Sequence, residues 1–380
     1  MIEKIKIFTE DAVWIKDKIY FFSRYWNALY AVNIKLGITE FISIMPEEDI
    51  TAVRLCAGIM YYNEKLILVP MTAKKIWIYD LKKNSWKGLE RKYMTDGNPH
   101  KEMFRAIEYK NNFFLVGSNY PGIIRLNPDN YELEYLRAPY AFLESVKSES
   151  ECYFRTDHLL VGNHLFLASC LNHFVLCLDL DTFDFKWLEV GERGFQYSGI
   201  AWDGEYYWLS PRRGTPVIKW DGKDKTEYFS LPDGFDCNTY NFSGVQYDDG
   251  KLVFPGMLQA RTILIDPEHP YDMEILKERY TFYRCSERGM RLSQTADGIL
   301  QWKHQGQSRS EQIPCEIFPA DLTEYIRAQS RKKTCRKIES EILAEFPSAL
   351  ILYILMVEQG TGTGKRKSEI GETIWRTTRS

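Results

Sequence analysis

The 380-residue sequence lacks the side-chain spacings that usually mark a metal centre or a catalytic nucleophile. Its eight cysteines include no CxxC pair, no two of its six histidines stand four residues apart, and no Gly-x-Ser-x-Gly segment occurs. Zinc sites and nucleophile elbows depend on such spacings. We therefore predict no cofactor, no metal site and no catalytic residue from local motifs.

The sequence also lacks a strong net charge and a long hydrophobic run. Its 49 Lys and Arg residues nearly balance 52 Asp and Glu residues, which gives a formal net charge of -3 and no polybasic signature of nucleic-acid binding. The longest apolar run, residues 349–357, is about half as long as a membrane span. Residues 1–8 alternate charged and apolar side chains, unlike a signal peptide. We expect no nucleic-acid partner and no transmembrane segment.

The cysteines are scattered, and several stand inside apolar segments, as Cys177 does in residues 174–178. Eight cysteines could form four disulfides in an oxidising compartment. Buried free thiols in a reducing compartment are the simpler interpretation, because free cysteine behaves as a small hydrophobic residue. We therefore predict a cytoplasmic protein.

Internal repetition is the main signal that is present. An apolar segment, a tight polar turn and a second apolar run recur seven times, at residues 13–22, 59–68, 107–115, 158–167, 200–209, 245–254 and 293–302. After each of the first six copies comes another apolar run that ends in Asn or Asp, at Asn33, Asp80, Asn127, Asp179, Asp221 and Asp266. These positions are separated by roughly the 40–50 residues of one propeller blade.

Each repeat is interpreted as a four-stranded antiparallel blade, with strands A to D from the inside outward. Turns such as residues 248–250 supply the positive φ of tight hairpins, and Gly58, Gly199 and Gly244 fall in strand A, where blades crowd together. A sandwich or barrel is the alternative, but repeated units favour radial arrangement. We predict an all-β fold, a seven-bladed β-propeller, over residues 1–318.

The seventh copy lacks a convincing fourth strand, whereas residues 2–8 form an apolar strand with no blade of their own. We therefore predict that this N-terminal strand completes the last blade and closes the ring, which places Ile5 near Leu300.

The segment Phe22-Ser-Arg-Tyr-Trp-Asn-Ala-Leu-Tyr-Ala-Val-Asn33 resembles a phrase of uncharacterised bacterial kelch- and WD-like propeller repeat proteins. The resemblance covers roughly residues 1–318. The chain departs from kelch repeats in lacking a Gly-Gly pair, and from WD repeats in lacking paired Gly-His and Trp-Asp. The resemblance implies the architecture and no particular partner.

Residues 319–380 are predicted to form a short helical C-terminal extension with a Gly-rich linker. Asp321 is a suitable helix N-cap, and residues 360–367 combine Gly, Thr and basic residues. A phosphate-binding loop is the alternative interpretation of that linker. It requires Ser or Thr after Lys365, where the chain has Arg366.

In a propeller the D–A and B–C connections share one face, and here they are long and irregular. Binding residues tend to lie on such loops, and Tyr, Trp, Arg and Asn carry much binding energy. We predict a protein- or glycan-binding site from Arg24, Tyr25, Trp26, Asn119, Tyr120, His173, Arg212, Arg213, Gln259 and Arg261. The leading interpretation is a non-catalytic binding or scaffold protein. The alternative is a propeller-type lyase or glycoside-active enzyme with an acid/base pair at the channel mouth.

Overall fold

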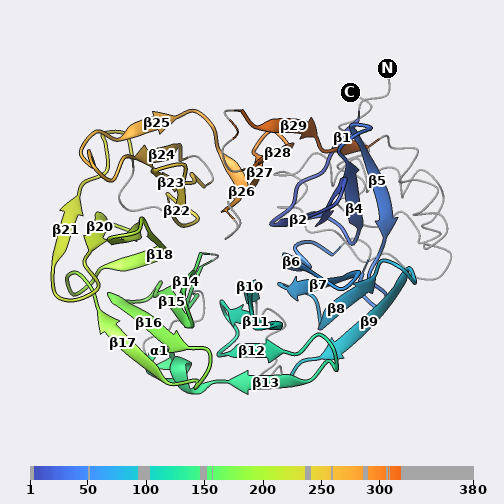
Figure 1. The fold of residues 1–380 in the computed structure, drawn as a ribbon, viewed down its shortest axis with the longest axis horizontal. Helices are drawn as coiled ribbons and strands as arrows, with labels where there is room; N and C mark the ends of the chain where they lie inside the picture. The colour runs from blue at the N-terminus through green and yellow to red at the C-terminus, as the bar shows by residue number, and fades with distance from the viewer. Residues whose placement is uncertain are drawn as a thin grey trace, which may run out of the picture.

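The computed structural model describes residues 4–49, 52–92, 103–145, 152–155, 157–235, 241–257, 260–285, 290–304, 307 and 309–317. Seven four-stranded antiparallel sheets stand around a central axis as blades (Figure 1). In every blade the strands follow one another in chain order from the inside to the outside, as strands A to D. The predicted all-β seven-bladed propeller is confirmed.

The strands of the first four blades are, in order, β2 (Ala12–Ile15), β3 (Lys18–Phe22), β4 (Leu29–Asn33) and β5 (Ile38–Ser43); β6 (Cys56–Tyr62), β7 (Lys65–Pro70), β8 (Lys75–Asp80) and β9 (Ser85–Glu90); β10 (Met103–Tyr109), β11 (Asn112–Gly117), β12 (Ile123–Leu126) and β13 (Leu133–Leu136); β14 (Leu159–Val161), β15 (His164–Ala168), β16 (Phe174–Asp179) and β17 (Phe185–Glu189). Between blades 3 and 4 lie a 3-10 turn, Ala138–Tyr140, and one short helix, α1 (Ala141–Glu144).

The strands of the last three blades are β18 (Gln196–Trp202), β19 (Tyr207–Arg212), β20 (Val217–Trp220) and β21 (Thr226–Phe229); β22 (Gln246–Asp248), β23 (Lys251–Phe254), β24 (Thr262–Ile265) and β25 (Glu274–Leu276); β26 (Tyr280–Cys285), β27 (Arg291–Thr295), β28 (Ile299–Lys303) and β29 (Glu311–Pro314). Two further short strands, β1 (Ile5–Lys6) and β30 (Glu316–Ile317), pair with each other.

The turns have the local chemistry that the repeats predict. Asn63 and Glu64 in the A–B hairpin of blade 2 have φ values of 44° and 60°, and Asp249 and Gly250 in blade 6 have 49° and 79°. Two consecutive positive φ values are typical of the two-residue hairpin turn that matches strand twist. At the end of strand C in blade 2, the Asp80 carboxylate accepts the backbone N–H groups of residues 82 and 83. Both predicted turn types are therefore present.

The N-terminal strand joins the two ends of the propeller, but the prediction that it completes the last blade was wrong, because β29 is the fourth strand of that sheet and β1 pairs only with β30. In the antiparallel pair β1–β30, Ile5 lies opposite Ile317, and the Ile7 N–H donates to the Cys315 carbonyl at 2.8 Å. Ile5 and Leu300 belong to the same buried apolar cluster. The strand that β1 meets is the direct continuation of β29, so the two ends of the propeller are joined at its outer part.

The strand assignment within the seventh blade was wrong by one strand. Residues 293–302 were expected to supply strands A and B, but they contain parts of β27 and β28, which are the second and third strands of the sheet. Strand A is β26, whose hairpin to β27 carries no copy of the repeated phrase. The blade therefore has four strands of its own, and β1 is added beyond them.

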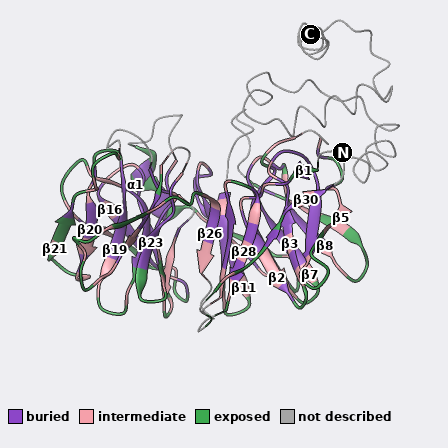
Figure 2. Cartoon of the chain, turned by 90° about the horizontal axis from the view of Figure 1, so that it is seen from above, coloured by how far each residue is buried: buried purple, intermediate pink, exposed green. Residues whose placement is uncertain are grey.

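Six buried apolar clusters hold neighbouring blades together, one between each consecutive pair from blades 1 and 2 to blades 5 and 6, and one between blades 7 and 1 (Figure 2). Aromatic side chains contribute to all six, for example Trp26 and Trp302 between blades 7 and 1, and Trp208 between blades 5 and 6. Fully burying such a ring removes a large apolar area from water. The propeller is thus stabilised mainly by face-to-face packing of adjacent sheets.

The interface between blades 6 and 7 is polar in the described residues. Asp248 accepts a hydrogen bond from the Tyr283 hydroxyl at 2.7 Å and lies 3.2 Å from the Arg291 guanidinium. Beside this pair, Lys303 forms an ion pair with Asp249. Charged contacts therefore contribute to this joint in the described residues.

The D–A and B–C connections form one end of the propeller, which we call the loop face. In Figure 2 strand β26 runs away from the end that carries β1, β30 and α1, so strand A of this blade starts at the loop face. Among the described residues, none of the helical segments has the length and apolar character that crossing a membrane requires. The predicted C-terminal extension, residues 319–380, lies outside the described residues and stays a prediction.

Candidate functional site

Asp157 occupies the centre of the ring and joins four blades. Its carboxylate lies 3.5 Å from the Arg105 guanidinium of blade 3, and both side chains are buried. A Cβ on Gly199 of blade 5 would lie 2.8 Å from the Asp157 Cβ, and a Cβ on Gly244 of blade 6 would lie 1.8 Å from its Oδ2. The predicted structural reason for glycine in strand A, crowding where blades converge, is therefore confirmed at these two positions.

Burial raises the pKa of Asp157 to about 6, and the Arg105 charge, a hydrogen bond from Gln246 and the Val245 N–H lower it against that effect. A carboxyl with such a pKa is suited to proton transfer near neutral pH. Here, however, the carboxylate is buried and its oxygens are engaged by groups from neighbouring blades. The geometry is that of a structural ion pair.

Asp11 plays the same part for the other three blades. Its carboxylate, just before β2 of blade 1, lies 3.1 Å from the Arg284 guanidinium of blade 7 and accepts the Ile59 N–H of blade 2 at 3.2 Å. Arg284 also contacts the Met60 sulfur at 3.5 Å. Two buried carboxylates therefore tie together all seven inner strands.

Arginine side chains form two clusters on the loop face. In the first, Arg24 and Arg54 share one oxygen of Glu10, at 3.1 and 3.3 Å. Backbone hydrogen bonds fix this cluster, since the Arg24 N–H donates to the Phe8 carbonyl and the Arg54 N–H donates to the Arg24 carbonyl, both at 2.7 Å. The Arg54 side chain is 44% exposed. A charged group is thus held rigidly at the surface between blades 1 and 2.

The second cluster connects blades 4, 5 and 6. The Arg212 guanidinium, at the end of β19, lies 3.4 Å from the Cys152 sulfur, and Arg155 lies 4.0 Å from the Met257 sulfur of blade 6. Arg212 is buried, whereas the next residue, Arg213, is exposed with a φ of 29°. Arg213 and Arg261, in the B–C connections of blades 5 and 6, are exposed.

The aromatic residues predicted as binding platforms are buried. Trp26 is 1% exposed and donates its indole N–H to the Tyr30 hydroxyl at 2.8 Å, and Tyr120 is 0% exposed. Tyr25 is also buried and packs edge-on against Phe8 at 5.6 Å. None of these three rings therefore has a face open to a ligand.

The remaining predicted residues are divided. His173 is buried with its Nε2 2.9 Å from a Glu189 carboxylate oxygen, and Asn119 is half-buried. Arg24 and Arg212 belong to the arginine clusters described above, Arg213 and Arg261 are exposed on loop-face connections, and Gln259 lies outside the described residues. Sequence reasoning missed Arg54, Arg155 and Cys152, whose proximity to these residues depends on loops from different blades.

Among the described residues, the side chain of Phe142 is exposed at the loop face. Phe142 in α1 is 43% exposed and packs against Phe174 and Trp187, with ring centroids 5.3 Å away in both cases. It adds an apolar contact point at the outer part of the loop face, next to the connection that carries Cys152 and Arg155.

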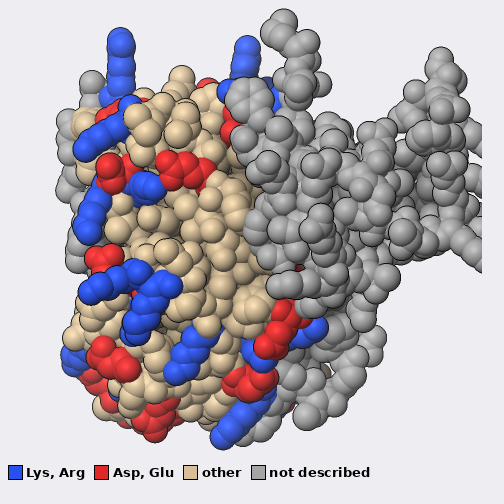
Figure 3. Space-filling view, turned by 90° about the vertical axis from the view of Figure 1, so that its right-hand side faces the viewer, with Lys and Arg blue, Asp and Glu red and all other residues tan. Residues whose placement is uncertain are grey.

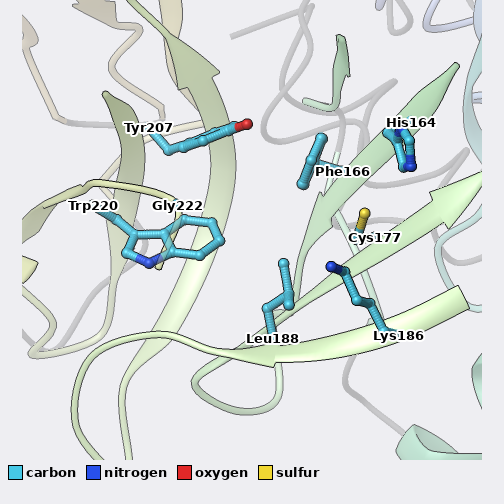
Figure 4. Close-up of a pocket in the computed structure, with 8 residues that line it drawn as sticks. All are labelled: His164, Phe166, Cys177, Lys186, Leu188, Tyr207, Trp220 and Gly222. Atoms are coloured by element: carbon cyan, nitrogen blue, oxygen red, sulfur yellow. The ribbon is translucent and has the colours of Figure 1, made fainter. Parts of the chain in front are cut away.

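A separate groove of about 260 Å³ lies between blades 4 and 5 (Figure 4). Its floor is aromatic, since Tyr207 packs against Phe166 at 5.3 Å and Trp220 at 5.1 Å, and its edge carries His164 and Lys186. Burial raises the pKa values of Cys177 and Tyr207, so both stay protonated at neutral pH. The groove has room for one side chain but presents no reactive group beyond ordinary His and Lys.

Comparison with known proteins supports the propeller fold and nothing more specific. No protein-family model and no curated protein matches the sequence. Among solved structures, the chain is similar to a selenomethionine-substituted virginiamycin B lyase from Staphylococcus aureus, with 11% identity, 72% of this chain and 89% of that chain covered, and a TM-score of 0.52. It is similar to a streptogramin B lyase (10% identity, 83% and 95% covered, TM-score 0.53) and to BamB from Moraxella catarrhalis (12% identity, 78% and 85% covered, TM-score 0.52). Propellers with different names thus share this architecture.

Proposed function

We propose that the chain is a non-catalytic binding protein whose loop face recognises an acidic segment of a partner protein. The observation that carries the proposal is the pair of arginine clusters, which present side chains from blades 1, 2, 4, 5 and 6 on one rigid face. Guanidinium groups bind carboxylates through two parallel hydrogen bonds and are enriched at the energetically important positions of interfaces.

The contacts of the central carboxylates argue for binding over catalysis. The enzyme alternative needs an acid/base pair open to substrate at the channel mouth. Asp157 and Asp11 are instead buried, each is paired with an arginine, and each contacts a backbone N–H of another blade. Groups engaged in this way hold the blades in place.

A protein partner is favoured over a glycan because the three loop-face rings that the sequence predicted as platforms for sugars are buried. Tyr25, Trp26 and Tyr120 are all buried in the blades. What the face offers is exposed arginine and the apolar edge of Phe142, a combination that suits a protein hot spot. On the side of the molecule viewed in Figure 3, acidic and basic side chains are interspersed.

The test is charge reversal at the loop face. A partner is captured from the source cell by cross-linking, purified, and its affinity for the full chain measured by calorimetry. Arg54→Glu and Arg213→Glu are each expected to weaken binding about tenfold or more, which corresponds to about 1.4 kcal/mol per substitution. Lys35→Glu, an exposed lysine at the opposite end of blade 1, is the matched control and should leave affinity unchanged.

Two results would count against the proposal. If the loop-face variants and Lys35→Glu bind the partner with equal affinity, the loop face is not the binding site. Binding to a glycan array that survives both arginine substitutions would favour the carbohydrate interpretation.

We further propose a cytoplasmic location. The support is that six cysteines in the described residues are free thiols and that four of these are buried in the propeller. Thiols persist most readily in a reducing compartment. Fractionation of the source cell with an antibody against the chain tests this.

A further inference from the structure

Two cysteines from different connections meet at the loop face beside the second arginine cluster. Cys152 lies in the connection before β14, and Cys170 lies in the B–C connection after β15. The Cys170 N–H donates to the Tyr153 carbonyl at 2.9 Å, which holds the two backbone segments side by side. The Cys170 thiol lies beside the Cys152 sulfur, close enough to lower the pKa of Cys152. Neither is in a disulfide.

The surroundings distinguish the two sulfurs. The Cys152 sulfur is half-buried and accepts a hydrogen bond from the Arg212 guanidinium at 3.4 Å. The hydrogen bond from Cys170, together with the charges of Arg155 and Arg212, lowers the pKa of Cys152 well below that of an ordinary thiol, against the opposing effect of burial. Burial and the neighbouring Cys152 charge raise the pKa of Cys170. A thiolate and a protonated thiol are therefore in contact.

No other described cysteine has this environment. Cys285 is half-buried like Cys152, but burial and the nearby Asp248 carboxylate raise its pKa. Burial also raises the pKa of Cys56 and Cys315. Because the thiolate is the reactive form of cysteine, accessibility alone does not make Cys285 a comparable nucleophile.

We propose that Cys152 and Cys170 form a redox-active thiol pair that hydroperoxides convert into a disulfide. Cys152 is the nucleophile, Cys170 is the resolving thiol, and Arg212 is a positioning residue that holds the thiolate. The inference does not depend on the proposed binding function, because it rests on the position of the two cysteines and on the groups around them.

The reaction takes place in two steps. The Cys152 thiolate attacks the terminal oxygen of the hydroperoxide, so that an S–O bond forms, the O–O bond breaks and the departing alkoxide or hydroxide takes a proton from water. The Cys170 sulfur then attacks the resulting sulfenic acid, so that an S–S bond forms and the S–O bond breaks. The Cys170 proton leaves with the hydroxide as water. Two electrons pass from the two thiols to the peroxide.

The experiment treats the reduced full-length protein with one equivalent of hydrogen peroxide, alkylates the remaining thiols and maps tryptic peptides by mass spectrometry. The expected product links the peptide that ends at Arg155 to the peptide that contains Cys170. Before oxidation, iodoacetamide at pH 7 should modify Cys152 at least about tenfold faster than Cys285, in keeping with the difference in thiolate fraction.

Four variants make the result decisive. In Cys170→Ser, Cys152 should stop at a sulfenic acid that a 1,3-diketone reagent traps. In Arg212→Lys, a positive charge remains and the linked peptide should still form, whereas Arg212→Gln should slow alkylation of Cys152. Cys285→Ser is the matched control and should behave as the parent protein. Thermal unfolding shows whether each variant is folded.

The proposal is overturned if Cys285 reacts as fast as Cys152, or if Cys152 in the parent protein passes to sulfinic acid without forming the linked peptide. Because neither readout involves a partner, failure of this inference is distinguishable from failure of the proposed binding function.

Discussion

Asp11 and Arg284 are 273 residues apart in the chain, and their side chains meet at 3.1 Å on the inner edge of the ring. The same joint, between blades 7 and 1, is closed at its outer part by the β1–β30 pair. The propeller is therefore fastened twice where its first and last blades meet, by an ion pair near the axis and by a strand pair far from it.

Asp11→Ala should lower the free energy of unfolding by about 3 kcal/mol. The substitution leaves the Arg284 guanidinium and the Ile59 N–H without their acceptor in a buried setting, and breaking a buried pair on one side is costly. Urea denaturation measures the loss. Asp17→Ala, which removes an exposed pair with Lys35, should change stability by only about 0.5 kcal/mol. Equal effects of the two substitutions would contradict a special role for Asp11.

Ile7→Ala tests the outer fastening. Ile7 is fully buried in the cluster shared by blades 7 and 1, so its truncation should cost about 2–4 kcal/mol. Lys6→Ala, on the exposed side of the same strand, should have almost no effect. The comparison is made by thermal or urea unfolding of the full chain. A small loss for Ile7→Ala would mean that the ring is closed without this strand.

Asp157 should give the protein a pH dependence opposite to that of an ordinary paired carboxylate. Its native pKa of about 6 lies above the value of 3.8 for a free Asp, so between these values the native state holds a proton that the unfolded chain has released. Stability from this group is therefore present below about pH 4 and is lost as the pH rises to about 6, by about 2–3 kcal/mol.

The measurement is urea denaturation from pH 4 to pH 7 on the parent protein and on Asp157→Asn. The difference in unfolding free energy between them should shift with pH in the stated sense, whereas Asp224→Asn, at an exposed position, should run parallel to the parent. A pH-independent difference for Asp157→Asn would show that Arg105 keeps Asp157 ionised throughout.

Gly244→Ala should be among the most destabilising single-methyl additions in the protein. The new Cβ would lie 1.8 Å from the Asp157 Oδ2, and the carboxylate has no room to retreat, since Gly199 also packs against it. We expect a loss of about 3 kcal/mol or more, at the upper end of overpacking costs.

The matched control is Gly162→Ala. Gly162 has a φ of 61° and no neighbouring atom within 4 Å of an added Cβ, so only backbone strain of about 1 kcal/mol applies. Urea unfolding compares the two. Similar losses would mean that the central residues move apart easily.

The sequence allowed prediction of the fold because its signals are local. The hairpin dipeptides and the Asn or Asp at the end of strand C each determine a turn within a few residues. Seven repetitions of the same unit then favour one arrangement, a ring of blades. The one misassignment arose where that signal is missing, since the β26–β27 hairpin lacks the repeated phrase.

The candidate site was less predictable because burial of a loop residue depends on packing between blades. Trp26 and Tyr120 look like exposed loop aromatics in the sequence, but the B–C connections fold back so that both rings enter the core. The contact between Cys152 and Arg212, which are 60 residues apart, has no local signature at all. A charged residue shortly before strand A, as in Asp11 and Asp157, is the one signal that could have indicated the central groups.

The polar joint between blades 6 and 7 is a place where the ring could open that is different from the joint between its first and last blades. Salt weakens ionic contacts such as Asp248–Arg291 while leaving apolar packing largely intact. Under such conditions the circle would open there, one blade before its sequence ends meet. Blade 7 would then stay attached to blade 1. The opened molecule would be a curved row of blades that begins with blade 7 and ends with blade 6, like a circularly permuted propeller.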